Sequence, residues 1–429
     1  MNGNLMVRVK EKQYGPISST ELRTMVRKGK FSPNDYVWND SQEEWVKAQD
    51  IEAVRKLFQT APLENTERKV IAIASGKGGV GKTVISASLG VGLSALGKEV
   101  ILVDADFGGA NLHTCMGILE PQYTFLDYYT MNRETLEDIV LDSPIDNLKL
   151  ISGACGTLGM ANPKFSQKQR LIGELKNLPA DYVIMDLAAG SSFHVIDFFL
   201  SVDESIIVTT PEPMAIQESF DFIKLCLLRK LQQTFKNDQE ALRLLNIEGD
   251  GNLIYFNQPL EDVVGKIKNS HPDIAQKVEQ ALSEFRPRLI LNMVMEPDEI
   301  REGMSLKTAA FELLSVDLDY MGYVDYDDNM RQSAKSLRPF LLNNPNSPAA
   351  RSIAKIITLK LFNQKHISAM MKKWQLRRKV YSQAQQYPTF EEKNNDIICS
   401  VKCFYWDECE FQNGGMPCRV RNLQPTMKF

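Results

Sequence analysis

A chain of 429 residues, 43% hydrophobic and 24% charged, can bury the core of a globular protein, and its length predicts two to four domains. The formal net charge of −4 gives no whole-protein case for nucleic-acid binding. No run of about 18 apolar residues occurs, which excludes a membrane-spanning helix. The N-terminus has no signal-peptide pattern, so the cytosol is the expected compartment.

Residues 1–58 predict a small α+β module. MVRVK and YVWN are typical of strands, YGPIS predicts a turn, and the capping box S-x-x-E begins a helix over 18–30. The polar segment QTAPLENTER, residues 59–68, is a predicted linker.

The module resembles the GYF-like domain family, whose members bind proline-rich peptides. Gly15-Pro16, the predicted helix, Val37-Trp38 and Trp45 carry that resemblance over about 50 residues. It implies a peptide-binding role for the module. The other interpretation is that both tryptophans form the core of a small domain.

Residues 69–362 predict a doubly wound α/β domain with a mostly parallel sheet. KVIAIAS, EVILVDAD, DYVIMD, SIIVTTP and LILNMV are short apolar runs, and the helical pattern TVISASLGVGLSALGK follows the first. Strands that are apolar throughout indicate a sheet covered on both faces, with its functional loops at the carboxyl ends. The polar stretch 232–285 predicts surface helices.

A phosphate-binding loop follows the first of these strands. Residues 76–83 fit G-x-x-x-x-G-K-[ST] between a predicted strand and a predicted helix, the context that the motif requires. Lys82 would reach the β/γ-phosphate oxygens, and the Thr83 hydroxyl would hold Mg²⁺. The residues expected to bind nucleotide here are Gly76, Lys77, Gly78, Gly79, Val80, Gly81, Lys82, Thr83 and Val84.

Acidic residues end two further strands. Asp104 and Asp106 end EVILVDAD, and Asp186 ends DYVIMD. Side chains two apart in a strand point the same way, so Asp104 and Asp106 are both expected to face the phosphate site. One carboxylate could serve the metal and the other could orient the attacking water.

KGGVGKT, VDADFGGANLH, MDLAAGSS and VTTPEPMAIQES together resemble the MinD/ParA class of P-loop ATPases. The similarity covers roughly residues 69–362 and is greatest to the MinD-like branch that includes flagellar-number regulators. It implies ATP and Mg²⁺ as cofactors and an ATP-dependent homodimer. Val84 and Ala188 depart from the common pattern without removing a charge.

The resemblance also implies residue roles. Lys77 would cross the dimer interface to the partner's nucleotide, so that Lys77, Lys82 and Asp106 form the catalytic set. Asp106 would position the attacking water, and Thr83, Asp104 and Asp186 would serve Mg²⁺. Asn292 falls where family members contact the adenine base.

The function implied is a slow ATPase switch that dimerises with ATP and positions or counts a cellular structure, such as a flagellum or the division machinery. The alternative is an iron–sulfur carrier ATPase of the Mrp type, which shares the loop with two lysines. Such carriers use a C-x-x-C pair within the ATPase domain, whereas the cysteine cluster of this chain lies beyond it. A third interpretation, an amidotransferase-type or nitrogenase-reductase-type enzyme, lacks the expected cluster cysteines.

Residues 363–396 predict a basic amphipathic helix and linker. Ile367, Met370, Met371 and Trp374 recur at helical spacing, and the segment 351–379 holds nine Lys or Arg and no acid. Such a helix could anchor the protein peripherally at the inner membrane face, pack its apolar stripe on the protein, or bind DNA non-specifically, although nucleic acid is the least favoured partner.

The segment 397–429 is rich in cysteine. Cys399, Cys403, Cys409 and Cys418 have the spacing C-x3-C-x5-C-x8-C. Four thiolates close in sequence could hold Zn²⁺ or an iron–sulfur cluster. Free thiols and redox-labile disulfides are the alternatives.

Overall fold

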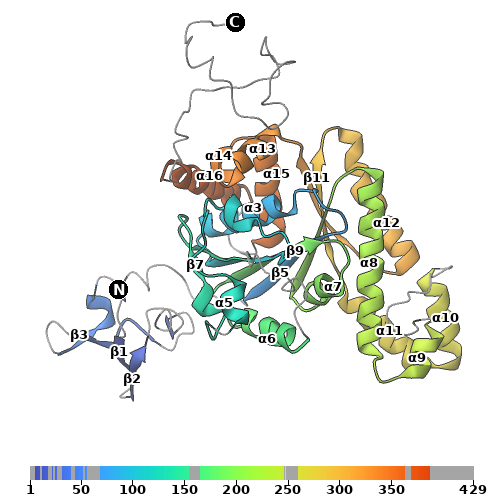
Figure 1. The fold of residues 1–429 in the computed structure, drawn as a ribbon, viewed down its shortest axis with the longest axis horizontal. Coiled ribbons are helices and arrows are strands. Elements are labelled where there is room, and N and C mark those ends of the chain that lie inside the picture. The colour runs from blue at the N-terminus through green and yellow to red at the C-terminus, as the bar shows by residue number, and fades with distance from the viewer. Residues whose placement is uncertain are drawn as a thin grey trace, which may run out of the picture. The chain divides into compact units, whose positions relative to one another are not determined.

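The computed structural model describes residues 5–9, 12–17, 22, 25–26, 31–39, 44–51, 54–55, 68–130, 132–153, 165–245, 247, 259–362 and 369–386. The tail cysteines and most of the linker therefore lie outside the described residues. A large mixed α/β domain with an eight-stranded sheet dominates this part of the chain (Figure 1).

The large sheet has the order β12-β11-β10-β5-β9-β6-β8-β7 and is parallel except at the antiparallel β7 edge. Its central strands are buried throughout, as the apolar runs predicted. The strands are β5 (Lys69–Ser75), β6 (Val100–Ala105), β7 (Leu141–Asp142), β8 (Leu148–Ile151), β9 (Tyr182–Ala189), β10 (Glu204–Thr209), β11 (Arg288–Val294) and β12 (Asp319–Asp325). The predicted α/β fold class is confirmed.

Helices cover both faces of this sheet because successive strand side chains alternate between two cores. In β5, Val70 and Ala72 join one core, whereas Ile71 and Ile73 join the other. The Val70 core packs against α5 (Phe125–Tyr129), α6 (Phe165–Leu175), α7 (Phe193–Leu200), α8 (Pro213–Thr234) and α12 (Ile300–Leu314). The Ile71 core packs against α3 (Lys82–Ala95), α4 (Leu112–Cys115), α13 (Asp328–Lys335), α14 (Phe340–Asn343), α15 (Pro348–Ile356), the π-helical turn η4 (Ile357–Leu361) and α16 (Ala369–Gln386).

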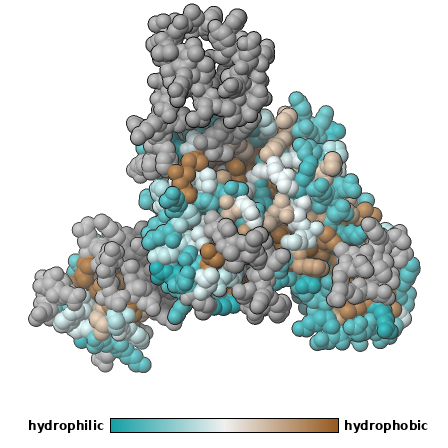
Figure 2. Space-filling model, in the orientation of Figure 1, coloured by the Kyte–Doolittle hydropathy of each residue, from teal (hydrophilic) through white to brown (hydrophobic). Residues whose placement is uncertain are grey.

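Helices fill the described parts of the region 232–285, as predicted. They are the end of α8, then α9 (Gln239–Leu244), α10 (Leu260–Ser270) and α11 (Pro272–Glu284). The last two bury one apolar side each, with Val264 and Val278 among the buried residues. Hydrophilic residues are prominent on their outer surface in Figure 2, as expected of amphipathic surface helices.

The N-terminal module contains a separate antiparallel sheet of order β2-β1-β3-β4. Its strands are β1 (Leu5–Val9), β2 (Lys12–Ile17), β3 (Tyr36–Asn39) and β4 (Glu44–Lys47). The turn predicted at YGPIS is wrong, because residues 14–17 belong to β2. Pro16 is compatible with this strand since β2 lies at the sheet edge, where a missing N–H donor is tolerated. Within the predicted helix, Leu22, Met25 and Val26 are described, and they are helical.

The basic helix α16 packs on the large α/β domain. Leu376 and Val380 are buried in the Ile71 core, and Lys372 is 7% exposed with its Nζ donating to the Phe362 carbonyl oxygen. This packing supports the second of the three interpretations of the helix. The side chains of the apolar stripe at Ile367, Met370, Met371 and Trp374 lie outside the described residues. In the described part of the chain, no helix is long and apolar enough to cross a bilayer.

Candidate functional site

The phosphate loop connects β5 to α3, and its shape depends on glycine. Gly79 and Gly81 have φ values of 81° and 83°, in the left-handed region that other residues rarely adopt. A Cβ on Gly76 would lie 2.3 Å from the Glu218 carbonyl oxygen, so the backbone approaches α8 too closely for a side chain. Gly78 and Gly79 are exposed to solvent. A tight, accessible loop at a helix N-terminus can cradle a phosphate group.

Lys82 begins α3 directly behind this loop. Its Nζ donates a hydrogen bond to Asp186 Oδ1 at 3.0 Å, and the two side chains are 8% and 2% exposed. A buried ammonium group needs a counter-charge. Asp186 supplies that negative charge, and phosphate oxygens could supply it in the same way.

Asp104 faces Asp186 across neighbouring parallel strands. The two residues are register partners in β6 and β9. Asp104 is fully buried and accepts hydrogen bonds from the backbone N–H groups of Leu112 (2.9 Å) and Asp106 (3.2 Å). Burial, and next the charge of Asp186, raise the pKa of Asp104 from 3.8 to about 7, although the two hydrogen bonds partly oppose this shift.

Two adjacent carboxylates and the half-buried Thr83 fit a magnesium ion. Carboxylate and hydroxyl oxygens are the ligands that Mg²⁺ takes in nucleotide sites, and a cation would offset both the burial and the repulsion by Asp186 that raise the pKa of Asp104. The residues predicted to hold the metal, Thr83, Asp104 and Asp186, are thus grouped near the start of α3, the end of β6 and the second half of β9; the prediction that Asp186 ends its strand is wrong, since β9 continues to Ala189. Their role in metal binding stays a prediction.

Asp106 lies beyond the end of β6, so strand alternation does not determine where its side chain points. Its Oδ1 accepts hydrogen bonds from the N–H groups of Gly108 (3.2 Å) and Gly109 (2.9 Å). The carboxylate therefore organises the start of the loop GGANLH, residues 108–113, which by the resemblance to the MinD/ParA class would be the first switch loop. Its role toward water stays a prediction.

Lys77 contacts its own chain. Its Nζ lies 3.4 Å from Glu212 Oε2, in the loop between β10 and α8, and both side chains are solvent-accessible. An exposed pair of this kind is weak, about 0–1 kcal/mol, and can exchange partners readily. The predicted contact of Lys77 with a partner's nucleotide remains untested by a single chain.

Asn292 lies at the back of the phosphate loop. It is fully buried, and its Nδ2 donates to the Val80 carbonyl oxygen at 2.8 Å. A Cβ on Gly81 would come within 2.4 Å of this nitrogen, so the amide also restricts the loop. Its buried Oδ1 has no hydrogen-bond partner among the described residues. That acceptor suits a ligand donor, but adenine contact stays a prediction.

Sequence reasoning missed two residues of this site. Ser86 is buried on α3 and lies 3.1 Å from Asp186 Oδ1, and Glu212 is the partner of Lys77. Ser86 could have been found from its position one helical turn after Lys82, which places both on one side of α3. Glu212 carried no such local signal, because the pairing spans 135 positions.

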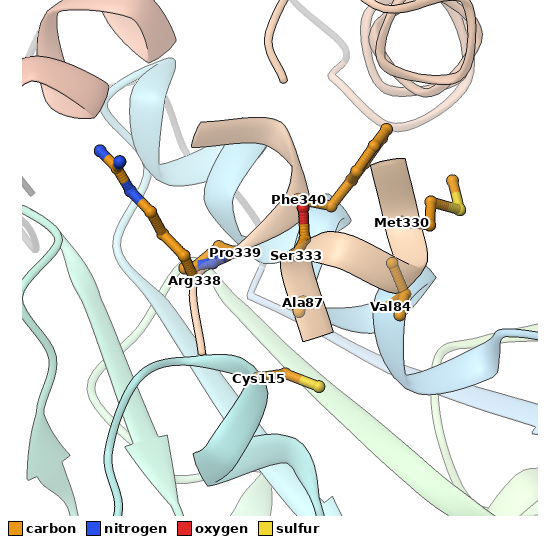
Figure 3. Close-up of a pocket in the computed structure, with 8 residues that line it drawn as sticks. All are labelled: Val84, Ala87, Cys115, Met330, Ser333, Arg338, Pro339 and Phe340. Carbon is orange, nitrogen blue, oxygen red and sulfur yellow. The ribbon is translucent and has the colours of Figure 1, made fainter. Parts of the chain in front are cut away.

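A small, mostly apolar pocket adjoins the site on the α3 side. Figure 3 shows Cys115 of α4 facing it together with residues of α3, α13 and the start of α14. Burial, with smaller contributions from Asp186 and Asp104, raises the pKa of the Cys115 thiol to about 11. The thiol therefore stays protonated at neutral pH. The lining residues are Val84, Ala87, Cys115, Met330, Ser333, Arg338, Pro339 and Phe340.

The tryptophans of the N-terminal module lie outside its core. Val7 and Val37 point into the core, so their strand neighbours Arg8 and Trp38 lie on the other face of the sheet. Trp38 packs edge-on against Trp45 with ring centroids 5.4 Å apart, and Arg8 lies 4.3 Å from the Trp45 ring centroid. This half-buried aromatic face argues against both tryptophans being core residues.

No group of three or more His, Cys, Asp or Glu suited to a metal occurs among the residues that the structure describes. The predicted tail site at Cys399, Cys403, Cys409 and Cys418 lies outside them, so both the zinc and the iron–sulfur hypotheses stay predictions.

Comparison with known proteins identifies two domains. Residues 68–240 match the AAA domain family, and residues 6–53 match GYF domain 2. The antiactivator FleN of Pseudomonas aeruginosa is 27% identical over 285 residues, which cover 66% of this chain and 82% of FleN. The septum site-determining protein MinD of Synechocystis sp. is 38% identical over 152 residues, or 35% of this chain and 56% of that MinD.

Among solved structures, a ParA family ATPase from Chlorobium tepidum is 19% identical, with a TM-score of 0.47. The alignment covers 68% of this chain and 99% of that one. The sequence relatives confirm the predicted resemblance, while the match to the Synechocystis MinD spans little more than half of its length.

Proposed function

We propose that the chain belongs to the MinD/ParA class of P-loop ATPases, on the match of residues 68–240 and the similarity to FleN and MinD, and that it carries a GYF domain at its N-terminus. From this premise we propose that it is a slow ATPase switch, which dimerises with ATP to position or count a cellular structure. A regulator of flagella or of the division machinery fits best, since the relatives include an antiactivator FleN and septum site-determining MinD proteins.

The observation that carries the proposal is the buried Lys82–Asp186 pair behind the glycine loop, with Asp104 beside it. A lysine, a glycine-shaped loop and two carboxylates at one edge of a parallel sheet form a complete set for binding ATP with magnesium. Nucleotide and metal binding accounts for the burial of three ionisable side chains, those of Lys82, Asp104 and Asp186, in one place.

Each residue of the set has a distinct task. The loop N–H groups bind phosphate oxygens, and Lys82 exchanges Asp186 for those oxygens. Asp104, Asp186 and Thr83 would hold Mg²⁺, which when bound would supply positive charge beside the transferring phosphoryl group. Asp106 orients the attacking water from the switch loop that it organises.

Lys77 links nucleotide binding to dimerisation in this proposal. It stands on the exposed loop, and the contact that it makes among the described residues, with Glu212, is weak, so breaking that contact costs little. A lysine from a second copy would neutralise charge near the transferring group, as an arginine finger does. ATP then favours the dimer to the extent that it binds that state better.

The remaining modules would recruit partners. The aromatic face at Trp38 and Trp45 suits a proline-rich peptide, because proline rings pack well on aromatic side chains. The exposed Arg377, Arg378 and Lys379 of α16 could hold the protein peripherally at the inner face of an anionic membrane while the helix stays packed.

The test is the oligomeric state of the full chain with ATP and with ADP, measured by light scattering. We expect dimers with ATP and monomers with ADP. Asp106→Ala should accumulate the dimer because hydrolysis is slowed, whereas Lys77→Ala should stay monomeric while still binding ATP. Equal dimer fractions with the two nucleotides would contradict the proposal.

A further inference from the structure

Ser86 lies one turn after Lys82 on α3, and its side chain is fully buried. The hydroxyl oxygen lies 3.0 Å from the Lys82 carbonyl oxygen and 3.1 Å from Asp186 Oδ1. Both neighbours are acceptors, and a hydroxyl has one hydrogen to donate. Ser86 can therefore donate a full hydrogen bond to only one of these two acceptors at a time.

The carboxylate of Asp186 now shares its Oδ1 between Ser86 and the Lys82 ammonium group, each about equally close. When Lys82 turns to phosphate oxygens, Asp186 loses its strongest donor while remaining 2% exposed. A buried carboxylate that loses a hydrogen bond is destabilised unless another donor compensates. Ser86 is already within reach and can release the helical carbonyl, which keeps its backbone hydrogen bond.

We propose that Ser86 is a positioning residue, which holds Asp186 in orientation for Mg²⁺ by donating its hydroxyl hydrogen to Oδ1 once Lys82 contacts the nucleotide. This inference rests on the proposed function. Because Lys82 and Ser86 both bind Oδ1, the other oxygen, Oδ2, is left for the metal or its water among the described residues. Residues that hydrogen-bond a metal ligand commonly tune metal affinity by about 10- to 100-fold.

The helix offers a matched control. Ser88 is 1% exposed on the same helix, and its Oγ has no hydrogen-bond partner in the described part of the chain. Ser86→Ala and Ser88→Ala remove the same atom at the same depth. Only the first removes a donor to Asp186, so a difference between them reports on that hydrogen bond.

The experiment measures binding of a fluorescent, non-hydrolysable ATP analogue to the full chain, in EDTA and at increasing Mg²⁺ concentrations. We expect Ser86→Ala to raise the Mg²⁺ concentration for half-maximal binding about tenfold, with unchanged affinity in EDTA. Ser88→Ala should leave both values unchanged, and Ser86→Thr, which keeps a hydroxyl, should restore the wild-type value.

Identical Mg²⁺ dependence in Ser86→Ala and Ser88→Ala would overturn the inference. If Ser86→Ala does not fold, Ser86→Cys keeps the volume with a weaker donor, and an unchanged Mg²⁺ dependence there would overturn it equally. A wild-type protein that binds no analogue with Mg²⁺ would instead refute the proposed function itself, so the two failures are distinguishable.

Discussion

Replacing Asp104 by asparagine should stabilise the ligand-free protein while weakening Mg²⁺ binding. Burial and the neighbouring Asp186 raise the pKa of Asp104 to about 7, so above that pH the folded protein holds two repelling buried carboxylates. An amide of the same shape carries no charge. The site thus keeps a charge that costs stability in the absence of a metal.

The difference between the usual pKa of 3.8 and about 7 corresponds to about 4 kcal/mol, at about 1.4 kcal/mol for each tenfold change in proton affinity. The pKa is higher in the folded state, so the folded protein binds the extra proton. The wild type therefore loses this stability as pH rises from about 4 to about 7, and none returns above pH 7.

Asparagine also has a cost. Asp104 accepts backbone hydrogen bonds through both carboxylate oxygens, from Asp106 and Leu112, and an amide offers one oxygen. One N–H group loses its acceptor, at about 1–3 kcal/mol. The net expectation for Asp104→Asn at about pH 8 is a gain of about 1–3 kcal/mol in the free energy of unfolding.

The assay is urea denaturation in EDTA, without nucleotide, at several pH values between about 5 and 8. The unfolding free energy of the wild type relative to Asp104→Asn should fall across this range and level off near pH 7. Asp106→Asn, which changes the half-buried carboxylate at the same strand end, controls for a general effect. Parallel pH profiles for wild type and Asp104→Asn would refute the reasoning.

Further predictions concern the C-terminal helix and tail. Leu376→Ala should lower the free energy of unfolding by about 2–5 kcal/mol because it empties part of the core. Tyr381→Ala, at a 53% exposed position, should change the free energy of unfolding by no more than about 0.5 kcal/mol. Equal effects of the two substitutions in urea denaturation would show that α16 is not packed. Replacement of the exposed Arg377, Arg378 and Lys379 by glutamine should reduce ATP-dependent pelleting with anionic liposomes, and unchanged pelleting would exclude these side chains as the anchor. Metal analysis and the absorption spectrum of anaerobically purified protein test the tail cysteines. The wild type should hold about one Zn²⁺ or one cluster per chain, and Cys399→Ser should lose it. A metal-free wild type would leave only the thiol and disulfide interpretations.

The parts of the fold that the sequence predicted well are those with strong local patterns. The apolar runs at β5, β9, β10 and β11 were recognised to within a few residues, because a strand buried on both faces is apolar throughout. β7, β8 and β12 were not assigned as strands. β7 has two residues and β8 four, and β12, at the sheet edge, buries Met321 and Val324 and leaves its other residues partly accessible.

The prediction of a turn at YGPIS was wrong because the segment belongs to a strand. Gly-Pro is a strong turn signal in isolated sequence, but here β1 provides a pairing partner at the edge of the small sheet. The pairing is irregular at this point, because Tyr14 pairs with Val7 and Ile17 pairs with Leu5, so Gly15-Pro16 forms a distortion within the edge strand instead of a turn between strands.

The sequence by itself determined the phosphate loop, the start of α3 and the acidic strand ends, because motif spacing and strand periodicity act over a few residues. Only the tertiary structure decided which charges meet. It paired Lys82 with Asp186, turned Lys77 to Glu212, and placed Asn292 against the loop that lies 212 positions earlier. These contacts depend on which strands become neighbours, and that choice is made by burial of the whole sheet rather than by any short stretch of residues.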